Sequence, residues 1–147
     1  MRKAVIERKT NETQIALTLC LDGGIKSVKT DCGFFNHMLE LFAVHSGFGL
    51  EVECRGDSEV DFHHTVEDVG IALGQAFLSA IGDKRGIARY ADIVLPMDET
   101  LVLCAVDISG RGYLNFDAEM PAAKVFDGDG DTRAKYAGAF DSELAEE

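Results

Sequence analysis

The stretch from Asp61 to Phe77 constrains the fold of this chain most. Two histidines and two carboxylates, in the run His63-His64-Thr65-Val66-Glu67-Asp68, directly precede apolar and small residues that repeat at helical spacing. Residues four apart on a helix lie on one face, because each residue turns the helix by about 100°. The run therefore predicts a helix with an apolar face that must be covered and a second face that carries His63 and Glu67.

This periodicity also separates the two histidines. His64 and Asp68 share a line roughly 100° around the helix from the line of His63 and Glu67. Imidazole combined with carboxylate suits zinc, manganese, iron or nickel better than calcium or magnesium. The pattern predicts a metal site in which His63 and Glu67 hold one ion and His64 points elsewhere. The alternative is that both histidines cap the helix or face solvent.

The first half of the chain alternates strand and helix signals. Large apolar residues at every second position between Gln14 and Leu21 predict a strand with one buried face. Apolar residues at helical spacing after Asp31 predict a helix that ends at Gly47, and the histidine helix is expected to end at Gly82. Further strands are predicted at residues 4–10, 27–30 and 50–54.

The second half carries weaker signals. A chain break at Pro96-Met97-Asp98-Glu99 precedes a predicted strand from Thr100 to Ile108, and residues 113–118 are expected to be extended. The Asp-Gly repeat at 127–131 lacks the twelfth ligand of a calcium loop and predicts a mobile loop without metal. Asp141 is a plausible N-cap for a final helix, and the short acidic ending suggests a C-terminally incomplete chain.

Composition narrows the class of protein. The 147 residues with 46% hydrophobic content fit one domain or two small repeated halves. The net charge of −12, from 26 acids against 14 bases, argues against nucleic acid and against an anionic membrane surface as partners. The sequence shows no membrane-spanning run and no signal peptide. Four scattered cysteines predict buried free thiols and a cytoplasmic location: Cys20, Cys32, Cys54 and Cys104.

Six sequence blocks, in one order, resemble the imidazoleglycerol-phosphate dehydratase family of histidine biosynthesis. They are Arg8-Lys9-Thr10-Asn11-Glu12-Thr13, Gly33-Phe34-Phe35-Asn36-His37-Met38-Leu39, His63-His64-Thr65-Val66-Glu67-Asp68, Gly82-Asp83-Lys84-Arg85-Gly86-Ile87-Ala88-Arg89, Pro96-Met97-Asp98-Glu99 and Asp107-Ile108-Ser109-Gly110-Arg111. The resemblance implies an α+β fold of two pseudo-repeated βα halves, similar to domain 2 of ribosomal protein S5. The halves would be residues 1–90 and residues 91–147, the second without its last strand and metal-binding helix.

The resemblance also implies an activity and its cofactors. The family removes water from D-erythro-imidazole glycerol phosphate to give imidazole acetol phosphate, and uses two Mn²⁺ ions per site. The metal ligands implied here are His37, His63, His64 and Glu67, with His37 as the third ligand beside His63 and Glu67. Chains of the family assemble as a homo-oligomer of 24 subunits made from trimers.

The remaining site residues are implied by position in the matching blocks. Glu12 matches a glutamate that transfers protons. Arg89 and Arg111 match residues that hold the substrate phosphate, a task that suits the guanidinium fork. From the sequence pattern alone, surface ion pairing of these arginines is the alternative. His45 and Asp98 match positions of possible substrate contact.

Two departures from the family pattern separate competing functions. Asn36 stands where the family usually has Asp, and Phe62 where it commonly has a second Asp, so support of a ligand histidine is expected to weaken. A second His-His-x-x-Glu is absent from the 147 residues. A non-catalytic form that binds metal only partially is therefore the alternative function, and we expect the 147 residues alone to be inactive. A metal hydrolase with Glu12 or Asp68 as its base is a third hypothesis.

Overall fold

The computed structural model describes residues 1–120, 124–126 and 139–146. The chain divides into two compact units, one of Met1–Gly82 with Ala118–Glu147 and one of Asp83–Asp117. The division into repeats at residues 90 and 91 remains a prediction.

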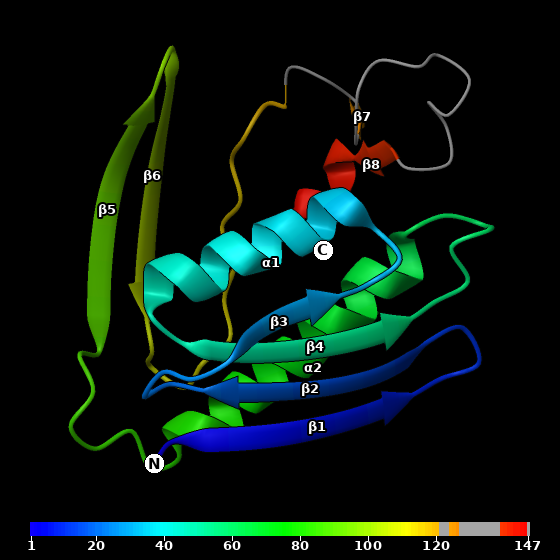
Figure 1. The fold of residues 1–147 in the computed structure, drawn as a ribbon. Coiled ribbons are helices and arrows are strands. Elements are labelled where there is room, and N and C mark those ends of the chain that lie inside the picture. Colours follow the sequence, from blue (N-terminus) through cyan, green and yellow to red (C-terminus); the bar gives the residue numbers. More distant parts are fainter. Residues whose placement is uncertain (121–123, 127–138, 147) are drawn as a thin grey trace. The chain divides into compact units, whose positions relative to one another are not determined.

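The first unit contains a four-stranded sheet and two helices (Figure 1). Its strands are β1 (Lys3–Lys9), β2 (Gln14–Cys20), β3 (Lys26–Lys29) and β4 (Gly49–Arg55). They lie in the order β1-β2-β4-β3, and only the β3–β4 pair is parallel. The helices are α1 (Gly33–Ser46) and α2 (His63–Ile81). The predicted α+β class is confirmed.

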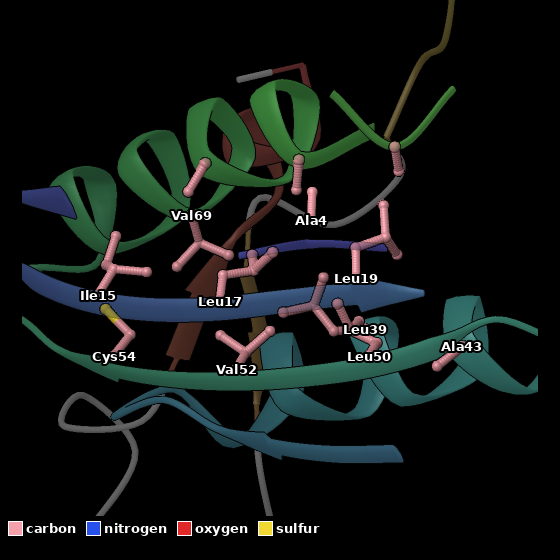
Figure 2. Close-up of a cluster of buried hydrophobic side chains, with 13 residues drawn as sticks. Ala4, Ile15, Leu17, Leu19, Leu39, Ala43, Leu50, Val52, Cys54 and Val69 are labelled. Atoms are coloured by element: carbon pink, nitrogen blue, oxygen red, sulfur yellow. The ribbon is translucent and has the colours of Figure 1, made fainter. Parts of the chain in front are cut away.

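One face of this sheet forms the main core. The register aligns Ile6 with Leu17 and Leu17 with Val52 across β1, β2 and β4, so their side chains leave the same face. Figure 2 shows Leu17 and Val52 in one layer with Val69 of α2. Leu39 of α1 belongs to the same cluster. Both helices therefore cover one face of the sheet, and the other face carries polar side chains.

Glycine ends both helices, as the sequence predicts. Gly47 follows α1 with a φ of 74° and donates its N–H to the carbonyl of Val44 at 3.3 Å, and Gly82 follows α2 with a φ of 54°. Positive φ carries little steric cost only for glycine, which stops the helix there. The helix ends are thus fixed by local backbone chemistry.

The last described residues of the first unit form a smaller layer. Strand β7 (Lys124–Phe126) pairs with β8 (Ala139–Asp141), and a 3₁₀ helix, η1 (Ser142–Ala145), follows. Asp141 does precede a helix, but it makes no side-chain cap and instead pairs with Lys124 at 2.7 Å. The Phe140 ring is stacked with Phe35 and tilted against Phe34, both of α1. The predicted loop at 127–131 lies outside the described residues.

The second unit is a β-hairpin. Strands β5 (Tyr90–Met97) and β6 (Thr100–Asp107) pair in register from Tyr90 opposite Asp107 to Met97 opposite Thr100. The turn consists of Asp98 and Glu99, and Asp98 adopts a positive φ of 49°. The predicted chain break thus begins two residues too early, because Pro96 and Met97 continue β5. Residues 113–118 form no strand.

The structure tests the predicted burial of the cysteines and the predicted absence of a membrane-spanning segment. Cys20, Cys32 and Cys54 are buried, as expected, but Cys104 is exposed. The prediction for Cys104 is wrong because an apolar strand sequence does not itself supply a covering layer. Among the described residues, no helix combines the length and apolar character needed to cross a membrane.

Candidate active site

The first turn of α2 gathers imidazole and carboxylate groups. Asp61 accepts a hydrogen bond from the backbone N–H of His63 at 2.9 Å and satisfies one of the open donors at the helix start. The His63 ring lies between two acids, with Nδ1 3.4 Å from Asp61 and Nε2 3.3 Å from Glu143 of η1. Nδ1 is nevertheless buried without a hydrogen-bond partner in the described part of the chain.

His64 has one well-defined partner. Its Nδ1 lies 2.9 Å from Oδ2 of Asp57, in the segment between β4 and α2. Hydrogen bonding to Asp57 raises the pKa of His64, burial opposes this, and the negative charges of Asp57, Glu12 and Asp61 add to the rise. In neutral imidazole, a proton held on Nδ1 leaves the lone pair on Nε2, which is the state that binds a metal.

The donor set at the start of α2 therefore fits a transition-metal ion. His64 is oriented by a carboxylate, Nδ1 of His63 has no hydrogen bond to any described residue, and Glu67 is exposed one turn after His63. Manganese accepts nitrogen and carboxylate oxygen ligands of this kind. These residues thus fit Mn²⁺ in their donor types and in the orientation of the His64 ring.

The predicted ligands are not grouped around one point. His37 is exposed on α1, and the described residues include no group of three His, Cys, Asp or Glu side chains that could hold an ion. The assignment of His37, His63 and Glu67 to one ion consequently remains a prediction. His45 is exposed in the last turn of α1, and its contact with substrate stays a prediction.

Asp68 is unsuited to act as a solvent-facing base. Asp68 is only 6% exposed, and its carboxylate forms an ion pair with Arg8 at 2.6 Å. Glu12, in contrast, is exposed in the turn between β1 and β2, and its charge acts on His64. Of the two bases considered for a metal hydrolase, the structure leaves only Glu12 accessible.

The two departures from the family pattern both have local roles. The Asn36 side chain accepts hydrogen bonds from the N–H and hydroxyl of Thr30, each at 2.7 Å, and donates to the Thr30 carbonyl at 3.2 Å. Phe62 is buried in the cluster with Cys32, Val66 and Phe140. Asn36 thus fixes the start of α1, and Phe62 anchors the start of α2.

The arginines of the second unit surround a carboxylate. Arg89 donates to Asp107 through Nε at 2.8 Å and Nη2 at 3.1 Å, a two-pronged pair across the hairpin. These hydrogen bonds lower the pKa of Asp107, slight burial opposes the shift, and the charges of Arg89 and Arg111 add to it. The Arg111 N–H donates to the Ser109 hydroxyl at 3.1 Å. Asp98 lies in the hairpin turn.

Sequence reasoning missed three acids in these contacts. His64 pairs with Asp57 across 7 positions, and Arg89 pairs with Asp107 across 18. His63 pairs with Glu143 across 80 positions. Periodicity does not connect these pairs, because the two residues of each pair do not belong to one continuous helix or strand. The register of the β5–β6 hairpin, in which Tyr90 lies opposite Asp107, is what brings Arg89 next to Asp107.

Comparison with known proteins decides the family. The family model for imidazoleglycerol-phosphate dehydratase matches residues 30–146. The chain belongs to this family. An imidazoleglycerol-phosphate dehydratase of Xanthobacter autotrophicus is 53% identical over 148 residues, which cover all of this chain and 69% of that protein. The enzyme of Caldicellulosiruptor saccharolyticus is 55% identical over 84% of this chain and 64% of its own length.

Solved structures of the imidazoleglycerol-phosphate dehydratase family agree with the fold. The crystal structure from Staphylococcus aureus superposes with a TM-score of 0.79 at 40% identity, and covers 98% of this chain and 72% of that chain. The enzyme of Pyrococcus furiosus, in complex with (S)-C348, gives a TM-score of 0.67 at 32% identity over 85% of this chain and 64% of its own. The chain thus spans roughly two thirds of these relatives.

Proposed function

We propose that the chain supplies residues to the active site of a hydro-lyase that converts D-erythro-imidazole glycerol phosphate to imidazole acetol phosphate. Membership of the imidazoleglycerol-phosphate dehydratase family carries this proposal. The orientation of His64 by Asp57 supports it, because a metal-binding imidazole commonly gives its other N–H to a carboxylate.

The proposed cofactor is manganese, with two ions in each complete site. Bound Mn²⁺ supplies Lewis-acid stabilisation of negative charge on the imidazole ring of the substrate. His64 would ligate through Nε2, and His63 with Glu67 would face the other ion, joined by His37. Glu12 would transfer the proton at the carbon next to the ring, since its carboxylate is accessible and acts on His64.

The substrate phosphate is proposed to bind to Arg89 and Arg111. Asp107 already receives both prongs of Arg89, so a phosphate must share or replace that carboxylate. Inorganic phosphate is then expected to inhibit competitively, and Arg111→Ala to raise KM about ten-fold by removing a charge-assisted hydrogen bond. Unchanged KM in both Arg89→Ala and Arg111→Ala would remove these residues from the site. Asp98 and His45 are proposed as further substrate contacts.

The family assembly is proposed for the complete protein, namely 24 subunits built from trimers. Assembly would bring ligands from other chain segments or copies to the exposed His37 and Glu67. Light scattering with and without Mn²⁺ measures the mass of the assembly directly. A mass that corresponds to a single chain under both conditions would contradict the proposed assembly.

A non-catalytic, metal-binding form is the second candidate. The observation that favours it is that the described residues group no three metal ligands. Turnover of the substrate with added Mn²⁺ separates the two functions. The proposed hydro-lyase requires turnover that depends on the metal, whereas metal binding without turnover supports the second candidate.

Variants of the three α2 ligands test the helical assignment of the ions. His63→Ala and Glu67→Ala are expected to abolish binding of the same ion, while His64→Ala spares that ion, because the first two share a helix line. Electron paramagnetic resonance of bound Mn²⁺ counts the ions in each variant. Loss of the same ion in His64→Ala and Glu67→Ala, with His63→Ala unaffected, would show that the assignment is wrong.

A further inference from the structure

Asp68 joins three parts of the first unit through one buried carboxylate. Its Oδ1 accepts from Arg8 of β1, through Nε at 2.8 Å and Nη2 at 2.6 Å. Its Oδ2 accepts from the hydroxyls of Thr13 and Thr10, the latter at 3.2 Å. Every oxygen of this α2 side chain is therefore committed to β1 or to the turn that follows β1.

The turn between β1 and β2 is organised by the Thr10 hydroxyl. That oxygen accepts the backbone N–H of Glu12 at 3.2 Å and of Thr13 at 2.9 Å, and the Thr10 N–H donates to the Thr13 carbonyl at 2.9 Å. The same hydroxyl donates to Asp68. Its single proton and its lone pairs thus link the backbone at Glu12 to a buried group on α2.

The geometry of α2 relates this link to the candidate site. Asp68 lies four residues after His64, on the same line of the helix. Glu12 lies in the clamped turn, and its charge acts on the His64 ring. The carboxylate of Asp68 therefore ties together the element that carries His64 and the element that carries Glu12.

We propose that Asp68 is a positioning residue that holds the Thr10–Thr13 turn against α2 and so sets where the Glu12 carboxylate stands relative to His64. The proposal rests on the proposed function, in which Glu12 transfers a proton. Asp68 itself is buried, and both of its carboxylate oxygens accept hydrogen bonds from residues of β1 or the turn. Its effect on turnover would pass through the position of Glu12, since small misplacements of a reacting group lower the rate strongly.

Four variants separate positioning from stability. Asp68→Asn keeps the size of the side chain and removes its charge. Thr10→Val removes the linking hydroxyl, whereas Thr10→Ser keeps it. Val69→Ala is the matched control, because Val69 is the fully buried neighbour of Asp68 on α2 and belongs to the apolar core cluster, where no hydrogen bond to the turn is at stake.

Amide hydrogen exchange tests the structural half of the proposal without an assay of activity. In Asp68→Asn and Thr10→Val, the amides of Glu12 and Thr13 are expected to exchange about ten-fold faster than in the wild type. In Thr10→Ser and Val69→Ala they are expected to keep wild-type protection. Unchanged exchange at both amides in Asp68→Asn would overturn the proposal.

Steady-state kinetics with Mn²⁺, measured on the complete protein because the 147 residues alone are expected to be inactive, tests the functional half. Asp68→Asn and Thr10→Val are expected to lower kcat by about 10- to 100-fold with KM changed by less than about three-fold, and Thr10→Ser to restore kcat. An equal loss of kcat in Val69→Ala would overturn positioning. If the wild type itself shows no turnover while Asp68→Asn still loosens the two amides, the proposed function fails and the clamp on Glu12 stands.

Discussion

Strands β2 and β6 have similar apolar sequences and opposite surroundings. Leu17 and Leu19 of β2 are 1% and 0% exposed, whereas Leu101 and Leu103 of β6 are 68% and 72% exposed. The first unit places α1 and α2 over one sheet face, while residues 83–117 contain a two-stranded hairpin and no helix of their own. Burial therefore depends on the layer that covers a strand, and the strand sequence alone does not determine it.

Thiol labelling should show the largest difference between these regions. Burial raises the pKa of Cys54 to about 11, with a smaller contribution from the charge of Asp31, so at pH 8 only about one Cys54 in a thousand is a thiolate. Cys104 of β6 is exposed. A thiol reagent at pH 8 is expected to modify Cys104 at least about a hundred-fold faster than Cys54, as measured by mass spectrometry of the peptides.

The control for labelling is unfolding. In concentrated urea, all four cysteines are expected to react at similar rates. Protection of Cys104 in the native protein equal to that of Cys54 would mean that an additional layer covers β6 in solution, and would remove the contrast between the two regions.

Truncation of leucine should separate the two sheets in stability. Leu17→Ala leaves a cavity under both helices and is expected to cost about 2–5 kcal/mol in the free energy of unfolding. Leu103→Ala removes a largely exposed side chain and is expected to change that free energy by less than about 0.5 kcal/mol. Urea denaturation followed by far-ultraviolet circular dichroism measures both. A comparable loss in the two variants would show that β6 is also covered.

Acid should weaken the first unit through Asp68. Burial of this carboxylate tends to raise its pKa, but hydrogen bonds from Thr13 and Arg8 and the Arg8 charge outweigh burial, so the pKa of Asp68 is lowered from 3.8. A lowered folded-state pKa contributes stability that is present above the unfolded pKa and is lost as pH falls through the folded value.

The Asp68→Asn variant measures this contribution. At pH 7 the variant is expected to lose about 1–3 kcal/mol, because Arg8 and the two threonine hydroxyls lose a charged acceptor. The difference from the wild type should shrink as pH falls below about 4, where Asp68 of the unfolded chain begins to protonate, and should vanish once pH falls through the lower folded-state pKa. A difference that stays constant from pH 7 to pH 2 would show that protonation of Asp68 does not govern acid stability.

Local signals predicted most of the first unit. Alternation between Gln14 and Cys20 predicted β2, and glycines 47 and 82 predicted the ends of both helices, because these features depend on neighbouring residues and backbone sterics. The i, i+4 rule correctly placed Asp68 on the same helix line as His64, but it did not predict that Asp68 is buried. Arg8 reaches Asp68 across 60 positions, a contact that depends on the packing of β1 against α2.

The candidate site was predicted less completely. Resemblance to the family implied roles for His64 and Glu12, which stay predictions. It did not indicate Asp57, whose pairing with His64 depends on the path of the segment before α2. The exposure of Cys104 was missed because residues 101–106 of β6 form a continuous apolar run, which is typical of a buried strand. Periodicity reports which residues share a face, whereas the identity of the covering layer is a tertiary property.

The smallest expected effect on stability concerns the ion pair of the hairpin. Arg89 and Asp107 meet at 2.8 Å and 3.1 Å, but both side chains are about half exposed, so water screens their attraction and ordering two side chains offsets it. Arg89→Ala should leave the unfolding midpoint in urea unchanged within error, in contrast to Leu17→Ala. The same variant should raise KM for the substrate if Arg89 binds phosphate. Thermodynamic stability and substrate affinity thus separate the two interpretations of Arg89. A clear loss of stability with unchanged KM would make the arginine a structural residue of the hairpin, and would give this unit a stabilising contact that its exposed surfaces do not suggest.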